Sequence, residues 1–99
     1  SKNDVKRLIA ETSPVLRSLG VKRIGLFGSF VDEKQTPESD IDLLVHFEPG
    51  MKTFDNFVEV SFLLEDRLMR RVELLTLESL SPHIGPKILG TVEYVELPA

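Results

Sequence analysis

The first twenty residues carry an apolar pattern with helical spacing. Residues 4–12 have the periodicity of a helix that Asp4 would cap at its start. Pro14 interrupts this pattern, because proline fits the first turn of a helix and disrupts its interior. Ser13 could therefore cap a second short helix that ends before Gly20; a single kinked helix is the alternative.

Four segments have the composition of β-strands. Residues 22–28 and 71–76 each carry three large apolar residues, and residues 92–95 are expected to form a short tail strand. The clearest alternation lies in residues 40–47, where apolar positions alternate with polar ones. The polar segment 30–39 is expected to be a loop.

Residues 53–69 have helical periodicity and more apolar surface than one buried face needs. The expected core stripe consists of Phe54, Phe57, Val58, Ser61, Leu64 and Leu68. Val58, Phe62 and Met69 form a second stripe beside it. Burial of the helix on two sides is the favoured explanation. The alternative is a surface for self-association, as in a homodimer, or for docking a partner protein.

Composition narrows the class of protein. The element order predicts one small domain over residues 1–99, with a three-layered α/β or α+β architecture. Twelve Lys and Arg are scattered among sixteen Asp and Glu, a balance that disfavours direct binding to a long nucleic acid. The chain has no cysteine and no apolar run long enough to span a membrane, so we expect a cytoplasmic protein.

Two carboxylates stand out on the strand 40–47. Asp40 and Asp42 are two residues apart, so both side chains should leave the same face, with Cβ atoms roughly 6.5–7 Å apart. Their mutual repulsion would raise one pKa unless a cation were bound. Mg²⁺ would remove that cost and keep coordination positions open for phosphate oxygens. His46 is expected at the end of this strand, on the opposite face.

Two further elements complete the candidate site. Gly28 would let the backbone approach a phosphate closely, and Ser29 offers a hydroxyl and an amide where a helix could begin. Glu73, flanked by apolar neighbours on the strand 71–76, is the candidate for a third acid. Arg71 shares its face and could meet a phosphate; a solvated charge or an ion pair with Glu73 is the alternative.

These motifs resemble those of a known family. Gly28-Ser29, ten intervening residues and then Asp40-Ile41-Asp42-Leu43-Leu44-Val45 are similar to the signature of DNA polymerase β-like nucleotidyltransferases. The short chain and the segment Val72-Glu73-Leu74-Leu75-Thr76 narrow the resemblance to minimal nucleotidyltransferases (MNT), which are commonly antitoxins paired with a HEPN-domain ribonuclease. The resemblance covers residues 21–76 closely.

The resemblance implies an α+β nucleotidyltransferase fold, with a small mixed sheet flanked by helices. It also implies a two-ion Mg²⁺ site, ATP as donor and AMP transfer to a tyrosine of a HEPN toxin. Asp40, Asp42 and Glu73 would hold the metal ions, with Glu73 also the base, while Gly28 and Ser29 would hold phosphate.

Two other functions stay open. The family often has Arg and Gly after Gly-Ser, where this chain has Phe30-Val31-Asp32-Glu33. That difference favours an antitoxin that acts by binding alone, with a weak or inactive site. A nucleotidyltransferase for small molecules is the third hypothesis, and it would require a further domain or a second chain.

Overall fold

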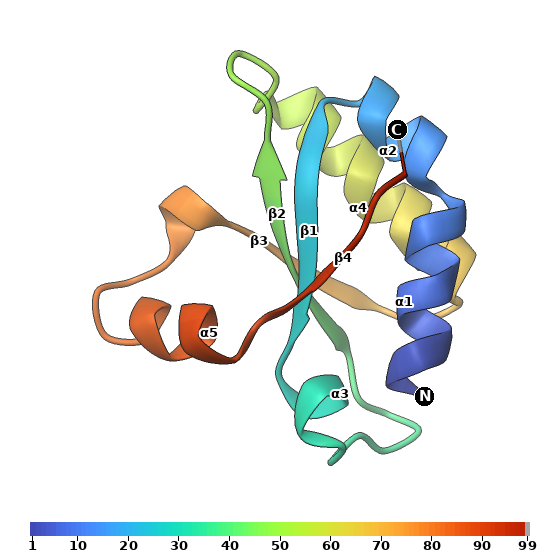
Figure 1. Ribbon diagram of the computed structural model, residues 1–99, viewed down its shortest axis with the longest axis vertical. Coiled ribbons are helices and arrows are strands. Elements are labelled where there is room, and N and C mark those ends of the chain that lie inside the picture. Colours follow the sequence, from blue (N-terminus) through green and yellow to red (C-terminus); the bar gives the residue numbers. More distant parts are fainter. Residues whose placement is uncertain (99) are drawn as a thin grey trace.

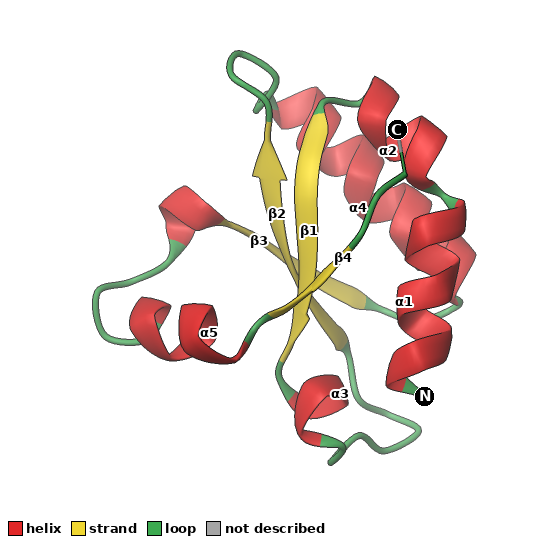
Figure 2. Cartoon of the chain, viewed as in Figure 1, coloured by secondary structure: helices red, strands yellow, loops and turns green. Residues whose placement is uncertain are grey.

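A four-stranded mixed sheet organises the computed structural model, which describes residues 1–98 (Figures 1 and 2). The strands are β1 (Val21–Phe27), β2 (Ile41–Phe47), β3 (Val72–Thr76) and β4 (Glu93–Val95). They lie in the order β3-β2-β1-β4, with β2 parallel to β3 and β1 antiparallel to both of its neighbours. The predicted strands are confirmed to within about two residues at their ends, as expected for boundaries.

The helices divide unequally between the two faces of the sheet. They are α1 (Lys2–Glu11), α2 (Ser13–Ser18), α3 (Ser29–Asp32), α4 (Phe54–Leu68), the 3₁₀ turn η1 (Leu77–Ser79) and α5 (Gly85–Thr91). In Figure 1, α1, α2 and α4 lie to one side of the strands and α5 to the other. The predicted α+β class with a mixed sheet is confirmed.

The main core lies between the sheet and the three helices α1, α2 and α4. Strand β2 contributes Ile41, Leu43 and Val45 to it, each almost fully buried. The other face of β2 carries Leu44, which packs with Phe27 and Ile88 under α5. Alternation along β2 therefore separates the main core from a smaller apolar cluster, and that second face also carries Asp42.

The N-terminal pattern forms two helices, as one of the two alternatives predicted. The caps differ from those expected: the Ser1 side chain accepts a hydrogen bond from the Asp4 amide at the start of α1. Thr12, whose φ is −91° and ψ 2°, stands between the helices in the place expected for Ser13. Gly20 follows with a positive φ of 86°, which ends the helical backbone.

The expectation that residues 30–39 form only a loop is wrong at its start, whereas the helix start expected at Ser29 is present. A single-turn helix, α3, begins at Ser29, directly after β1. Phe30 causes this, because its side chain is 3% exposed and belongs to the main core. An apolar anchor inside a polar segment holds the turn against the sheet. The turn ends at Glu33, which adopts a left-handed conformation.

Helix α4 is not buried on two sides, so that expectation is wrong. Val60 and Leu64 are its fully buried residues, whereas Phe62 is 65% exposed and Met69 84% exposed. Phe54, expected in the core stripe, is 80% exposed. One face of α4 meets the sheet and α1, and the second apolar stripe faces outward.

Within residues 1–98, no helix has the length and apolarity required to traverse a lipid bilayer.

Candidate active site

Asp42 occupies the centre of the candidate site and lies near the start of β2. In the antiparallel ladder its partner on β1 is Phe27, and in the parallel ladder its partner on β3 is Glu73. Opposite positions in neighbouring strands place their side chains on the same face. The sheet thus brings together two of the three predicted acids, on the face that α5 covers only in part.

Gly28 lies directly against Asp42. Its φ of 76° and ψ of −147° place it in backbone space that favours glycine. A β-carbon at this position would overlap the Asp42 carboxylate oxygen Oδ2. Glycine is therefore required twice here: for the turn from β1 into α3, and for the room in which the Asp42 carboxylate sits.

Ser29 follows as the first residue of α3 and is half-buried. The first amides that bond within this turn belong to Val31 and Asp32, and both donate to the Gly28 carbonyl at 3.1 Å. Among residues 1–98, the Ser29 hydroxyl has no hydrogen-bond partner within the protein. Gly28 therefore lies against Asp42, and Ser29 follows it with a hydroxyl group free for a ligand.

The electrostatics of the site concentrate on Asp42. Burial raises the pKa of this carboxyl, and the negative charges of Glu73 and Asp40 act in the same direction; together they raise it from its ordinary value of 3.8 to about 6. All three predicted acids are therefore close enough to interact. Holding Asp42 ionised at neutral pH costs free energy, which a bound cation would offset.

Asp40 lies one residue before β2 and contacts a cation. Its Oδ1 accepts a hydrogen bond from Arg71 Nε at 3.3 Å, and the Arg71 side chain is 82% exposed. Arg71 thus pairs with Asp40, and not with Glu73 as one of the predicted alternatives had it. In this arrangement no three His, Asp or Glu side chains of residues 1–98 are placed to hold one metal ion together.

The donor set nevertheless fits a hard divalent cation. Carboxylate oxygens are the ligands that Mg²⁺ prefers, and it takes few from protein when phosphate supplies others. Asp42 and Glu73 are adjacent across the ladder, and the raised pKa of Asp42 marks a charge without a compensating cation. Asp40 would have to turn from Arg71 to join them, which is an inexpensive movement for an exposed ion pair.

His46 lies on the same face as Asp42, so its expected position on the opposite face is wrong. Alternate residues of a strand share a face, so Asp42, Leu44 and His46 point to the same side of the sheet. The His46 Nε2 is 2.8 Å from the Tyr94 hydroxyl. The Arg23 guanidinium stacks 3.6 Å above the Tyr94 ring. Burial and the nearby Arg23 lower the pKa of His46. This group is a structural contact between β1, β2 and β4, at the far end of the strands from the acids.

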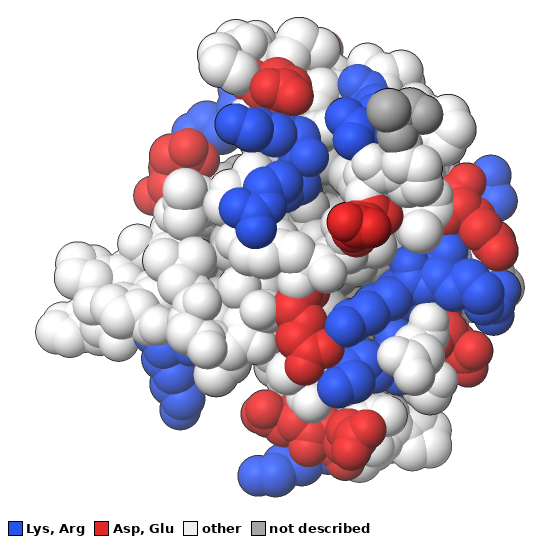
Figure 3. Space-filling model, in the orientation of Figure 1, with Lys and Arg blue, Asp and Glu red and all other residues white. Residues whose placement is uncertain are grey.

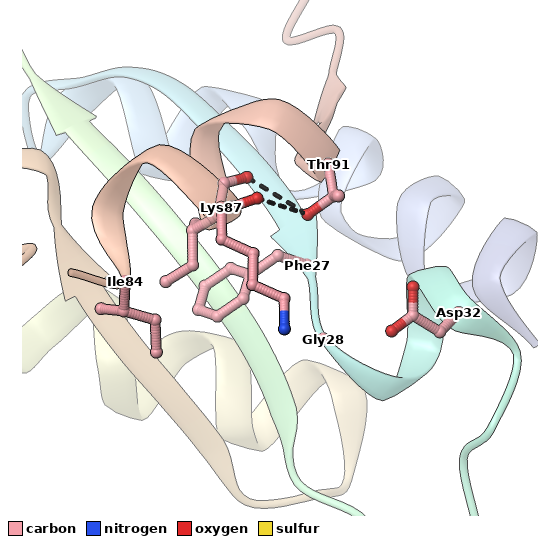
Figure 4. A pocket seen from close by; sticks show the side chains of 7 residues that line it. Phe27, Gly28, Asp32, Ile84, Lys87 and Thr91 are labelled. Atoms are coloured by element: carbon pink, nitrogen blue, oxygen red, sulfur yellow. Dashed lines mark hydrogen bonds between the residues drawn. The ribbon is translucent and has the colours of Figure 1, made fainter.

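A pocket of about 350 Å³ opens beside Gly28 (Figure 4). Its walls come from β1, α3 and α5, and it is lined by Phe27, Gly28, Asp32, Ile84, Lys87, Ile88 and Thr91. The volume lies in the range of small-molecule sites. Sequence reasoning did not find the α5 side of this pocket. The feature of the sequence that could have indicated it is Lys87, which is the only Lys, Arg, Asp or Glu between Glu78 and Glu93.

Comparison with known proteins agrees with the class that the fold and the site define. The sequence model of the polymerase β nucleotidyltransferase family matches residues 11–95, and the chain belongs to this family. A Methanocaldococcus jannaschii protein assigned as a protein adenylyltransferase is 39% identical over 88 residues, 89% of this chain and 90% of that protein. The protein adenylyltransferase MntA of Thermococcus cleftensis is 36% identical over 89% of this chain and 88% of its own length.

Solved structures share the fold. A structure described as a minimal nucleotidyltransferase superposes with a TM-score of 0.76 at 28% identity, over 88% of this chain and 89% of its own. A chain from the complex of a tri-AMPylated Shewanella oneidensis HEPN toxin with an MNT antitoxin has a TM-score of 0.68 at 20% identity. The match covers 99% of this chain and 74% of that chain. The predicted minimal nucleotidyltransferase family is confirmed; the roles of individual site residues stay predictions.

Proposed function

We propose that this chain is a Mg²⁺-dependent adenylyltransferase that transfers AMP from ATP to a tyrosine hydroxyl of a partner HEPN toxin, and so acts as an antitoxin. The observation that carries this proposal is the placement of Asp42 beside Glu73, with Gly28 against the Asp42 carboxylate. Relatives named as protein adenylyltransferases support transfer of an adenylyl group to protein.

The proposed roles follow from position. Asp42 and Glu73, with Asp40 after it releases Arg71, would hold the Mg²⁺ ions. Bound Mg²⁺ would neutralise these carboxylates and polarise the phosphate of the donor. Gly28 and Ser29 would bind the β- and γ-phosphates, because Gly28 leaves room for close approach and the Ser29 hydroxyl has no partner among residues 1–98.

The transfer itself would be a displacement at the α-phosphorus of ATP. The acceptor hydroxyl oxygen forms a bond to that phosphorus, the bond to the bridging oxygen of the β-phosphate breaks, and pyrophosphate leaves. The proton of the hydroxyl passes to Glu73, which is exposed and adjacent to Asp42. Placing donor and acceptor in line would account for most of the rate enhancement, because phosphoryl transfer is catalysed mainly by positioning and charge stabilisation.

Intact-mass analysis of the partner tests this function. The chain is incubated with Mg²⁺, ATP and the protein encoded by the adjacent gene. We expect the partner to gain the mass of one or more AMP groups, and Asp42→Asn to abolish the gain. Glu48→Gln, which removes an exposed carboxylate just after β2, at the other end of the strand from Asp42, is the control and should leave the gain unchanged. A wild-type chain that neutralises the toxin without any mass gain would contradict the proposal.

Binding alone is the second candidate function. Phe62 of α4 and Met69, which directly follows this helix, are 65% and 84% exposed. Such exposure is uncommon for large apolar side chains, and the two residues form a surface on which a partner could dock. The two candidates differ in what they require of the acids. An antitoxin that acts by contact would neutralise its toxin equally well as wild type and as Asp42→Asn, whereas Phe62→Glu would abolish neutralisation.

A further inference from the structure

Lys87 is a cation without an ionic partner at the mouth of the pocket beside Gly28. In Figure 4 its side chain runs from α5 toward Gly28, and its amino group ends near that residue. No carboxylate of residues 1–98 lies within 4 Å of this amino group. The carboxylate of Asp32 stands on the opposite side of the pocket (Figure 4).

The charge around the pocket is otherwise negative. Asp42 and Glu73 lie on the neighbouring strands, and Asp32 and Glu33 stand in α3 and just after it. ATP carries several negative charges, so its phosphates would be repelled here unless cations offset these acids. Lys87 is the only Lys or Arg among the residues that line the pocket.

Two other cations near the acids, Arg70 and Arg71, are committed to contacts of their own. Arg71 pairs with Asp40. The Arg70 Nη1 donates to the carbonyl oxygens of Thr36, Pro37 and Ser39 at 3.2, 3.0 and 2.9 Å, and thereby holds the segment before β2. Lys87 differs from both, because its amino group is free and faces the pocket.

The setting of Lys87 on α5 is also distinctive. It is the only charged residue from position 79 to position 92, and the α5 side of the molecule is mostly uncharged in Figure 3, whereas acidic and basic side chains intermix elsewhere on that view. Ile88, the next residue, is 6% exposed and anchors α5 on Phe27 and Leu44. The position of the lysine is thus fixed by the packing of its own helix.

We infer that Lys87 binds the terminal phosphates of the donor nucleotide, across the pocket from α3. The inference rests on the proposed function, in which Gly28 and Ser29 bind the same phosphates from the other side. Lys87 would supply from α5 the positive charge that residues 30–33 lack. An ammonium group acts there as a point charge with three donors, well suited to phosphate oxygens.

Isothermal titration with ATP and with AMP tests the inference, with Ca²⁺ in place of Mg²⁺ to prevent turnover. We expect Lys87→Gln to weaken ATP binding about tenfold or more, the usual contribution of a charged hydrogen bond, and to affect AMP far less. Lys87→Arg should keep most of the affinity. Lys22→Gln is the matched control, because it removes the same charge roughly 20 Å away at the other end of β1.

The outcomes separate this inference from the proposed function. Equal affinity of wild type and Lys87→Gln for ATP would overturn the role of Lys87 and leave the proposed function standing. Equal loss for ATP and AMP would overturn its assignment to the terminal phosphates. A wild-type chain that binds no ATP would overturn both. Because Lys87 is exposed, its variants should unfold at the wild-type temperature, which a thermal scan checks.

Discussion

Replacing Asp42 by asparagine should stabilise the metal-free protein. Burial and the charges of Glu73 and Asp40 raise the pKa of Asp42 to about 6 from an ordinary 3.8. The folded state therefore binds more protons than the unfolded state between these two values. The contribution of Asp42 to stability is therefore most favourable below about pH 4 and falls as the pH rises from about 4 to about 6. Above about pH 6 the folded state carries the full cost of the ionised carboxylate.

The magnitude follows from the size of this shift. Each pKa unit corresponds to about 1.4 kcal/mol, so the whole shift would correspond to about 3 kcal/mol. Asp42 is half-buried and solvent screens its neighbours, which reduces the expected cost to about 1–2 kcal/mol. For a domain of this size, Asp42→Asn should raise the melting temperature by roughly 5–10 °C at about pH 7.5.

Differential scanning calorimetry in chelator-treated buffer measures the effect. The gain should shrink toward zero near about pH 4, where the wild-type carboxyl is protonated in both states. Adding Mg²⁺ should stabilise wild type and leave Asp42→Asn almost unchanged. Asp66→Asn serves as the control and should show neither effect. An Asp42→Asn variant that melts at or below the wild-type temperature at pH 7.5 would refute the reasoning.

Three other predictions follow from particular contacts. Gly28→Ala should destabilise the fold by about 1–3 kcal/mol and more than Gly50→Ala, because both have a positive φ but only the first β-carbon would overlap a side chain; equal melting temperatures for the two variants would contradict this. Arg70→Ala should cost about 1–2 kcal/mol and speed amide exchange over residues 36–39, because Arg70 binds the carbonyls of three of these residues; unchanged exchange would show that the contact is not structural. His46→Gln should remove a contribution that makes stability rise with pH below about pH 6.5, because burial lowers the pKa of His46 from its ordinary 6.5 and protonation therefore favours unfolding; an unchanged slope would count against it.

Much of the fold could be predicted from local patterns. The alternation in β2 identified the strand and put Asp42 on its less covered face, and the Ser-Pro break separated α1 from α2. The same alternation places His46 on the face of Asp42, because the two residues are four positions apart on one strand, and the expected opposite face was wrong. These features depend on neighbours in sequence, which a single chain displays directly.

Features that depend on tertiary contacts could not be predicted in this way. The periodicity of α4 shows two apolar stripes, but it does not show that no element covers Phe62 and Met69. The single turn α3 exists because Phe30 reaches the core from a polar segment. Lys87 lies beside Gly28 because the chain returns after β3 and places α5 over Phe27, nearly sixty residues away in sequence.

Transfer of the adenylyl group can be followed directly with labelled ATP. The chain, its partner and Mg²⁺ are incubated in parallel with ATP labelled at the α-phosphate and ATP labelled at the γ-phosphate. If Asp42, Glu73 and Gly28 form an adenylyltransferase site, the partner acquires label from the α-phosphate alone, and Asp42→Asn abolishes it. Label from the γ-phosphate, or a partner that is neutralised without any label, would contradict the assignment of this site.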